Sequence, residues 1–233
     1  MARKYTVKFI LLFGLLLNSL ATLHAQVINS ISLSSGGDFE TVAFDVGDGV
    51  IVHLSKTGTV VRWGAIAFAN RNNNFPERLE PYTGKTDYFV STADSAFRGK
   101  IRFIGRTYFT YFSSFENQYL AGKLKTIGNI TFDYYREFEN ESFKGNVKSI
   151  GGQAVGWYPS FENSGAVGKL RSISNTSLTY YGSFDEASFR GKVKSIRNVA
   201  YSYYGRNDLP QNRGGLKTGS PIVNVNGITF LIR

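Results

Sequence analysis

The sequence predicts an all-β protein made of antiparallel β-hairpin repeats with a 23-residue period, arranged as a meander or a β-solenoid. Three observations predict this fold. Glycines recur every 23 residues without an insertion, at Gly99, Gly122, Gly145, Gly168 and Gly191. Each glycine opens a segment of the type G-K-V-K-S-I-G-N, whose isoleucine is the same in all five units, at Ile104, Ile127, Ile150, Ile173 and Ile196. An aromatic pair follows in every unit, at Tyr111-Phe112, Tyr134-Tyr135, Trp157-Tyr158, Tyr180-Tyr181 and Tyr203-Tyr204.

The five-unit array spans residues 88–211, and each unit is expected to hold two short strands. In the first unit these are residues 100–104 and 107–112, which carry β-branched and aromatic side chains at strand spacing. The return loop at 113–121 contains Phe115 and Leu120, which we expect to hold the loop against the sheet. Phe115 recurs one period later in each of the next three units, and an acidic residue follows each phenylalanine, at Glu116, Glu139, Glu162 and Asp185.

The segments on either side of the array have the same character with less regularity. Residues 26–87 form a degenerate β region with strand-like runs at 28–33, 41–44 and 49–54, and we expect them to continue the array as one elongated domain. Residues 70–87 are predicted to be a polar loop. Residues 212–233 are predicted to be a C-terminal cap that closes with a strand or hairpin at 222–232.

Residues 1–25 have the three parts of an export signal. Arg3, Lys4 and Lys8 form a basic start, an apolar run follows at 9–17, and a cleavage site is expected before Gln26. The apolar run is too short to span a bilayer, which needs about 20 residues. The sequence therefore predicts a protein exported to the periplasm, the cell surface or the medium.

The composition excludes several classes of chemistry. The 233 residues contain no Cys, one Met and two His, and 27 basic residues outnumber 17 acidic ones for a formal charge of +10. The three basic residues of the export signal account for the difference between +10 and +7 in a processed chain. Disulfide scaffolds and thiolate metal sites are excluded. His53 lies in a strand-like run and is expected to be structural. We therefore expect no enzyme activity, no cofactor and no metal site.

The 23-residue G-K-V-K-S-I-G-N unit followed by Tyr-Tyr, as at 122–135, resembles units of exported bacterial repeat proteins. The resemblance covers about residues 88–217 and implies no activity. In architecture the hairpin unit is similar to MORN repeats, and its aromatic pairs resemble those of choline-binding repeats. The Gly-rich frame of the first and the Gly-Trp frame of the second are missing, so neither resemblance implies ligand residues.

Two rows of side chains are the candidate binding residues. The two basic positions of the first strand are occupied by Lys100, Arg102, Lys123, Lys125, Asn146, Lys148, Lys169, Arg171, Lys192 and Lys194, of which nine are basic. Strand alternation places both positions on one face. The second aromatic of each pair is predicted to point away from the core, at Phe112, Tyr135, Tyr158, Tyr181 and Tyr204. Both rows have plain structural interpretations, as a solvated basic face and as cross-strand packing.

The turn between the two strands decides where these rows lie. A two-residue turn at Gly105 and Arg106 pairs position 102 with 109 and places the basic row on the core face. A three-residue turn pairs 102 with 110 and places the basic row beside the outer aromatics, although it leaves Ile104 on the basic face. We favour the three-residue register, because it buries more of the apolar residues.

The sequence thus favours an exported, non-enzymatic β-repeat protein that serves as a surface or extracellular binding module. The expected partner is an extended anionic polymer or glycan, such as an anionic polysaccharide or another polyanion. The alternative is a structural, self-assembling component of the cell envelope that associates through its sheet edges and has no soluble ligand. No specific protein partner follows from the sequence.

Overall fold

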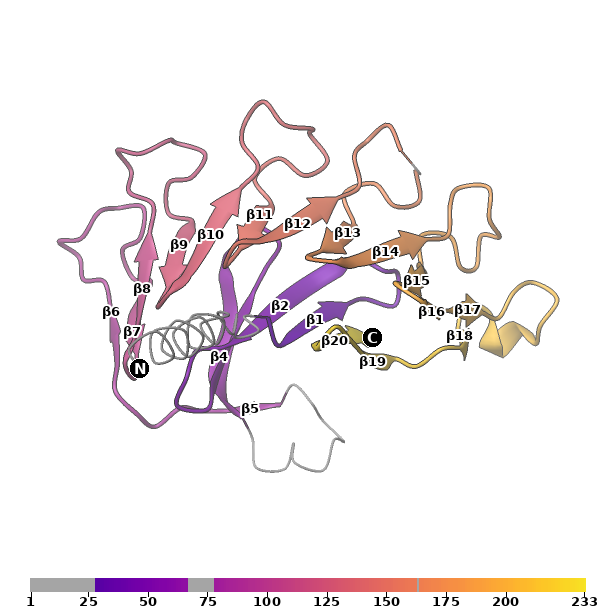
Figure 1. Cartoon of the computed structure of the whole chain (residues 1–233), viewed down its shortest axis with the longest axis horizontal. Coiled ribbons are helices and arrows are strands. Elements are labelled where there is room, and N and C mark those ends of the chain that lie inside the picture. Colours follow the sequence, from indigo (N-terminus) through magenta and orange to yellow (C-terminus); the bar gives the residue numbers. More distant parts are fainter. Residues whose placement is uncertain (1–27, 67–77, 163) are drawn as a thin grey trace, which may run out of the picture.

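The computed structural model describes residues 28–66, 78–162 and 164–233. Nearly all of its regular structure is β-strand, with one 3-10 turn, η2 (Pro210–Asn212), in the described part (Figure 1). The prediction of an all-β protein built from hairpins is confirmed. The predicted export signal at 1–25 lies outside the described residues.

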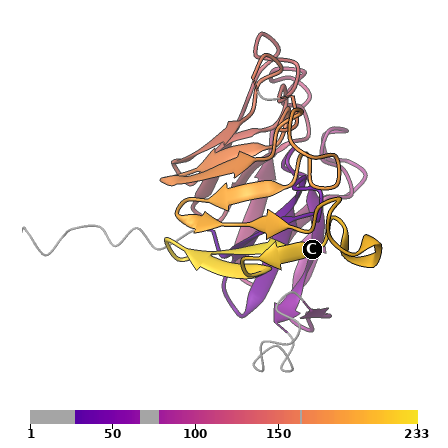
Figure 2. The ribbon, with the colours of Figure 1, turned by 90° about the vertical axis from the view of Figure 1, so that its right-hand side faces the viewer.

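The repeats form an 11-stranded antiparallel sheet whose strands follow one another in chain order, which is a meander. Its strands are β6 (Thr86–Tyr88), β7 (Ile101–Ile104), β8 (Thr107–Tyr111), β9 (Leu124–Ile127), β10 (Ile130–Tyr134), β11 (Val147–Ile150), β12 (Gln153–Trp157), β13 (Leu170–Ile173), β14 (Thr176–Tyr180), β15 (Val193–Ile196) and β16 (Val199–Ala200). The pair β17 (Ser202–Tyr203) and β18 (Leu216–Thr218) continues the pattern. The long return loops gather along one edge of this array (Figures 1 and 2).

The two ends of the chain build a second, seven-stranded sheet. Its order is β19 (Ile222–Val225), β20 (Ile228–Ile232), β1 (Ser30–Leu33), β2 (Phe39–Asp45), β3 (Val50–Leu54), β4 (Val60–Ile66) and β5 (Leu79–Glu80). The closing hairpin predicted at 222–232 is present as β19 and β20, and β20 pairs in parallel with β1. The expectation that residues 26–87 extend the array is wrong for β1 to β5, because they form a separate sheet in which β1 pairs with β20; only the first two residues of β6 in this range join the array. The predicted loop at 70–87 also holds β5 and most of β6 in its described part.

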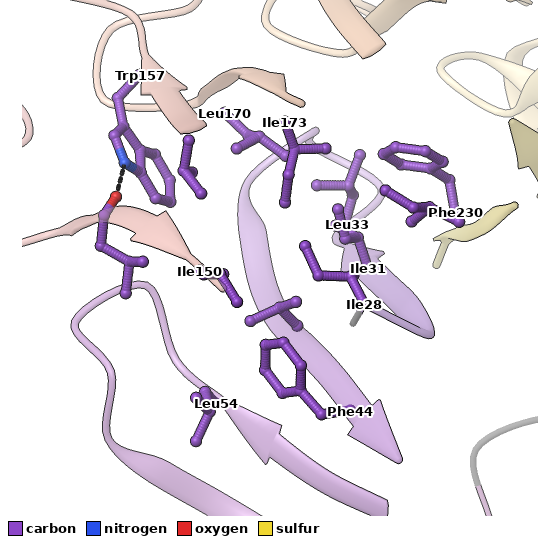
Figure 3. Close-up of a cluster of buried hydrophobic side chains, with 14 of the residues drawn as sticks. Ile28, Ile31, Leu33, Phe44, Leu54, Ile150, Trp157, Leu170, Ile173 and Phe230 are labelled. Carbon is purple, nitrogen blue, oxygen red and sulfur yellow. Dashed lines mark hydrogen bonds between the residues drawn. The ribbon is translucent and has the colours of Figure 1, made fainter. Parts of the chain in front are cut away.

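One hydrophobic core lies between the two sheets. Phe44 of β2 meets Phe132 of β10 edge to face with ring centroids 5.8 Å apart, and Phe39 meets Trp157 in the same way at 5.3 Å. Figure 3 shows side chains of the N-terminal strands facing side chains of the array across this core. A single sheet would leave the inner rows of the array in water, so the second sheet is the layer that covers them.

The hairpins have the two-residue turn. Ile104 lies opposite Thr107 and Phe103 opposite Tyr108, so the turn is Gly105 and Arg106, and the three-residue register that we favoured is wrong. The first turn residue has a positive φ of 57° at Gly105, which glycine adopts without steric cost. The preference of Gly-Asn sequences for two-residue turns thus outweighed our burial argument.

A β-bulge at the second basic position explains how the two-residue turn still buries the right residues. Between β8 and β9, Thr110 lies opposite Thr126 but Tyr111 lies opposite Leu124, so Lys125 is the extra residue. The same shift occurs at the equivalent basic residue of the other pairings, at Arg102, Lys148, Arg171, Lys194 and Lys217. A bulge interrupts strand alternation. Leu124 and Ile127 are therefore both buried while Lys125 is exposed, and the expected common face for the two basic positions is wrong.

Candidate functional site

The first basic position of each unit forms a row of internal bonds between units, the inner lysine row: Lys100, Lys123, Lys169 and Lys192. The Nζ of Lys123 donates to the Gly145 carbonyl at 2.6 Å, and Lys169 and Lys192 donate to Gly191 and Gly214 at 2.7 Å each. Lys100 makes the same bond to Gly122. Each ammonium also lies 4.8–5.5 Å from the centre of an inner aromatic ring of its own unit, at Tyr111, Tyr134, Tyr180 and Tyr203. The inner lysine row therefore joins each unit to the next.

Two of these lysines also reach the N-terminal sheet. Lys169 forms an ion pair with Asp38 at 3.3 Å and donates to the Gly36 carbonyl, both in the β1–β2 turn. Lys123 lies 3.5 Å from the carbonyl of Thr57 in the β3–β4 turn. Burial lowers the pKa of the ammonium groups of Lys100, Lys123 and Lys192. The bonds to the N-terminal sheet leave Lys123 and Lys169 little capacity to bind a ligand, whereas the Lys100 ammonium has only the Gly122 carbonyl and the Tyr111 ring as partners among the described residues.

The third unit departs from the row. Asn146 replaces lysine there, is 3% exposed, and its Nδ2 has no hydrogen-bond partner among the described residues. The inner ring of that unit is the larger Trp157, whose Nε1 donates to the Val147 carbonyl at 2.8 Å. In the third unit, therefore, the shorter Asn146 replaces lysine where the larger Trp157 replaces tyrosine.

The bulged positions form a second and more accessible row, the outer basic row: Arg102, Lys125, Lys148, Arg171, Lys194 and Lys217. Five of these side chains make an ion pair with an acidic residue of a preceding loop or strand, with N···O distances of 2.8–3.6 Å to Asp87, Glu116, Glu139, Glu162 and Asp208. The Lys125 and Glu116 side chains in such a pair remain 46% and 39% exposed. Exposed pairs of this kind are worth about 0–1 kcal/mol. An acidic ligand can therefore compete for the outer basic row.

The outer aromatics lie beside the outer basic row. Lys125 lies 5.2 Å from the Phe112 ring centre, and the same pairing joins Lys148, Arg171, Lys194 and Lys217 to Tyr135, Tyr158, Tyr181 and Tyr204 at 5.3–5.5 Å. Three of the hydroxyls donate to a backbone carbonyl 20 residues ahead at 2.9–3.0 Å, from Tyr135, Tyr158 and Tyr181. Burial raises the pKa of these three hydroxyls. Their rings are half-buried, and their polar ends already join successive units.

The loop tips carry a third row, the loop-tip phenylalanines: Phe115, Phe138, Phe161 and Phe184. These side chains are 80–106% exposed, whereas Leu120 at the base of the first loop is buried. The expectation that Phe115 holds its loop against the sheet is therefore wrong, and Leu120 alone has that role. In the sequence, each of these phenylalanines has Ser, Asn or acidic residues around it, a composition typical of a tight turn. That composition is the signal that could have predicted their exposure to solvent.

The acidic residues hold the loop tips in place. Glu116 accepts a hydrogen bond from the Ser113 amide at 2.7 Å while it pairs with Lys125, and Asp185 accepts one from the Gly182 amide at 2.5 Å. Neighbouring loops are also bonded to one another. Asp94 accepts hydrogen bonds from the amide and the hydroxyl of Ser114 at 2.9 and 3.0 Å, and Asn140 donates to Ser160 at 3.1 Å. The loop-tip phenylalanines are thus presented by braced loops.

The remaining candidate, His53, is 1% exposed within β3. Its Nδ1 lies 3.3 Å from the Thr41 hydroxyl and 3.5 Å from Nη2 of Arg62. Burial, and then the charges of Arg62 and Arg233, lower its pKa from 6.5 to about 4. A neutral, enclosed imidazole of this kind belongs to the core.

No known family model, curated protein or solved structure matches this chain. Within the described ranges, no helix has the length and apolar character needed to cross a membrane. The described residues also contain no group of three or more His, Cys, Asp or Glu side chains placed to hold a metal ion.

Proposed function

We propose that this chain is an exported, non-enzymatic binding module that engages an extended anionic glycan along the loop edge of its array. The observation that carries the proposal is the row of loop-tip phenylalanines, exposed in four successive units on braced loops. Large apolar side chains in a folded protein are usually buried, and an ordered row of exposed ones is typical of an interaction surface. The export part of the proposal rests on residues 1–25.

The energetics support contact with a partner. Covering one phenylalanine side chain contributes roughly 1.5–3 kcal/mol. Binding also costs the ordering of side chains and loops. Here the hydrogen bonds of Glu116 and Asp185 and the links between loops have already ordered the backbone that carries the rings. Four such contacts along one edge therefore favour a partner that repeats along that edge.

The surroundings of the phenylalanines favour a glycan. Glu116, the residue after Phe115, pairs with Lys125, whose ammonium lies 5.2 Å from the Phe112 ring centre. The next two units repeat this arrangement with Glu139, Lys148 and Tyr135 and with Glu162, Arg171 and Tyr158. Aromatic faces pack on sugar rings, while the charged groups bond to hydroxyl and acid groups of a polysaccharide. Successive hairpins of a meander lie about 9–10 Å apart, which is twice the interstrand spacing.

Retention of the purified protein on three supports tests this proposal: immobilised heparin, an insoluble uncharged polysaccharide, and vesicles with anionic lipid. The test variant carries serine at Phe115, Phe138, Phe161 and Phe184. The control variant carries serine at Val90, Tyr108 and Leu209, which are 59–64% exposed apolar residues outside the row. We expect retention of the wild type and the control on heparin, and loss for the test variant at an unchanged melting temperature.

A second variant separates the contribution of charge. Glutamine at Lys125, Lys148, Arg171 and Lys194 should weaken retention on heparin and flatten its dependence on salt. A wild type that passes through the heparin support, or a test variant retained there as well as the control, overturns the proposal. Retention on vesicles alone also overturns it, in favour of a lipid surface.

A second candidate function is self-assembly, which the edges of the two sheets favour. β19 is an edge strand with Ile222 45% exposed, and β6 is an edge strand with Tyr88 45% exposed. Unpaired edges of this kind can add strands from another copy. Size-exclusion chromatography with light scattering tests it: a mass that grows with concentration supports assembly, and a monomer at all concentrations contradicts it.

A further inference from the structure

A cavity of about 300 Å³ lies where the array begins, between β4 of the N-terminal sheet and the first repeat unit. Three aromatic side chains line it, Trp63, Tyr88 and Tyr111, together with the ammonium-bearing Lys100 and the backbone of Gly99 and Gly122. Its volume is at the lower end of those of small-molecule sites. The cavity is separate from the loop-tip phenylalanines, none of which lines it.

Tyr111 differs from three of its four counterparts at this point, and only the fifth-unit ring, Tyr203, likewise has a hydroxyl without a hydrogen-bond partner among the described residues. In the next three units the polar tip of the equivalent ring donates to the carbonyl ten residues earlier, from Tyr134 at 2.7 Å, Trp157 at 2.8 Å and Tyr180 at 2.8 Å. The Tyr111 hydroxyl makes no hydrogen bond to any described residue. Its ring is nonetheless fixed, stacked on Phe97 at 6.2 Å and edge-on to Phe89 at 6.1 Å. The cavity is therefore lined by a tyrosine whose position is set and whose hydroxyl is available.

The Gly99 carbonyl also lacks a lysine donor among the described residues, as does the Gly168 carbonyl, which follows the unit that has Asn146 in place of lysine. The carbonyls of Gly122, Gly145, Gly191 and Gly214 each accept a bond from a lysine of the inner lysine row. No described residue donates to the Gly99 carbonyl, because Gly99 belongs to the first unit. An unused donor and an unused acceptor thus line one aromatic cavity.

We infer that this cavity binds one sugar unit that carries a carboxylate, such as a uronic acid. The inference rests on the proposed glycan-binding function and names the sugar chemistry at the start of the array. The faces of Trp63 and Tyr88 pack on the sugar ring, the Tyr111 hydroxyl and the Gly99 carbonyl bond to its hydroxyl groups, and Lys100 pairs with the carboxylate.

Tryptophan fluorescence reports directly on the cavity. The chain has two tryptophans, and Trp157 is 3% exposed in the core, so a ligand-dependent change reports on Trp63. The experiment titrates the full chain with glucuronate and, in parallel, with glucose as the neutral analogue. We expect a saturable change with glucuronate, and at least tenfold weaker binding of glucose.

Tyr111→Phe is the test variant and Tyr108→Phe the control. Tyr108 is 59% exposed and does not line the cavity. Removing the Tyr111 hydroxyl breaks no hydrogen bond to a described residue, so the melting temperature should not change, while glucuronate affinity should fall roughly tenfold. The control should bind as the wild type does.

Three outcomes overturn the inference: no saturable response to glucuronate, equal binding of glucose, or unchanged affinity in Tyr111→Phe. The variant with serine at the four loop-tip phenylalanines separates this inference from the proposed function. It should lose retention on heparin and still bind glucuronate in the cavity. A protein that is retained on heparin but gives no glucuronate response overturns the inference alone.

Discussion

The two basic rows differ in what they contribute to stability, and the pair Lys123→Met and Lys125→Met measures the difference. Methionine keeps most of the apolar length of lysine and removes the charge. Lys123→Met removes a 2.6 Å bond to the Gly145 carbonyl and an ammonium 4.8 Å from the Tyr134 ring centre. A hydrogen bond from a charged donor contributes roughly 1.5–3 kcal/mol and a cation–π contact roughly 0.5–1 kcal/mol. Relief of the desolvated ammonium offsets part of this sum. We expect a loss of about 2 kcal/mol in the free energy of unfolding.

Lys125→Met removes an ion pair with Glu116 at 2.9 Å, in which both side chains are more than a third exposed. The Lys125 ammonium also lies 5.2 Å from the Phe112 ring centre. An exposed ion pair contributes about 0–1 kcal/mol and an exposed cation–π contact roughly 0.5–1 kcal/mol, so the expected loss is about 1 kcal/mol, half of that at Lys123. Urea denaturation followed by circular dichroism measures both values, with the slope checked to be unchanged. Lys192→Met and Lys194→Met repeat the comparison in the fifth unit. Equal losses at Lys123 and Lys125, or a larger loss at Lys125, would refute the assignment of the inner lysine row to bonds between units.

Two further predictions concern the core and a turn. Because the pKa of His53 is about 4 in the folded protein against 6.5 in an unfolded chain, its neutral form stabilises the fold above pH 6.5, and this stability is lost as the pH falls toward 4. The free energy of unfolding should fall by about 2 kcal/mol more between pH 7 and pH 5 in the wild type than in His53→Gln; parallel pH profiles would contradict this. Ser174 has a φ of 49° at a turn position where the first three units have glycine. Ser174→Gly should therefore raise the free energy of unfolding by about 0.5–1 kcal/mol and shift the urea midpoint upward. An unchanged or lower midpoint would contradict the strain at Ser174.

The period of 23 residues was enough to predict the hairpins, because glycine, isoleucine and aromatic positions recur without a single insertion. The sequence did not reveal the bulge at Lys125, because a bulge is defined by the partner strand and changes which side of the strand each residue occupies. Strict alternation therefore placed Lys123 and Lys125 together, although one bonds the next unit and the other faces solvent.

The other failures have the same kind of cause. Phe115 recurs as regularly as the buried Leu124, and regular recurrence alone does not distinguish a core residue from an exposed one. The N-terminal strands have the composition of array strands, but the first of them, β1, pairs with β20, which lies about 200 residues away along the chain. Pairing at that distance leaves no local pattern, so only the folded structure shows it.

The parallel pairing of β20 with β1 has a consequence for how the number of units is set. Open repeat arrays gain or lose units freely, because each unit contacts only its neighbours. Here Ile31 lies opposite Phe230, so the last strand after the array must return to the first strand before it. Insertion or deletion of one 23-residue unit would leave every bond between units intact and still break this closure, so the length of the array is dictated from outside the repeats.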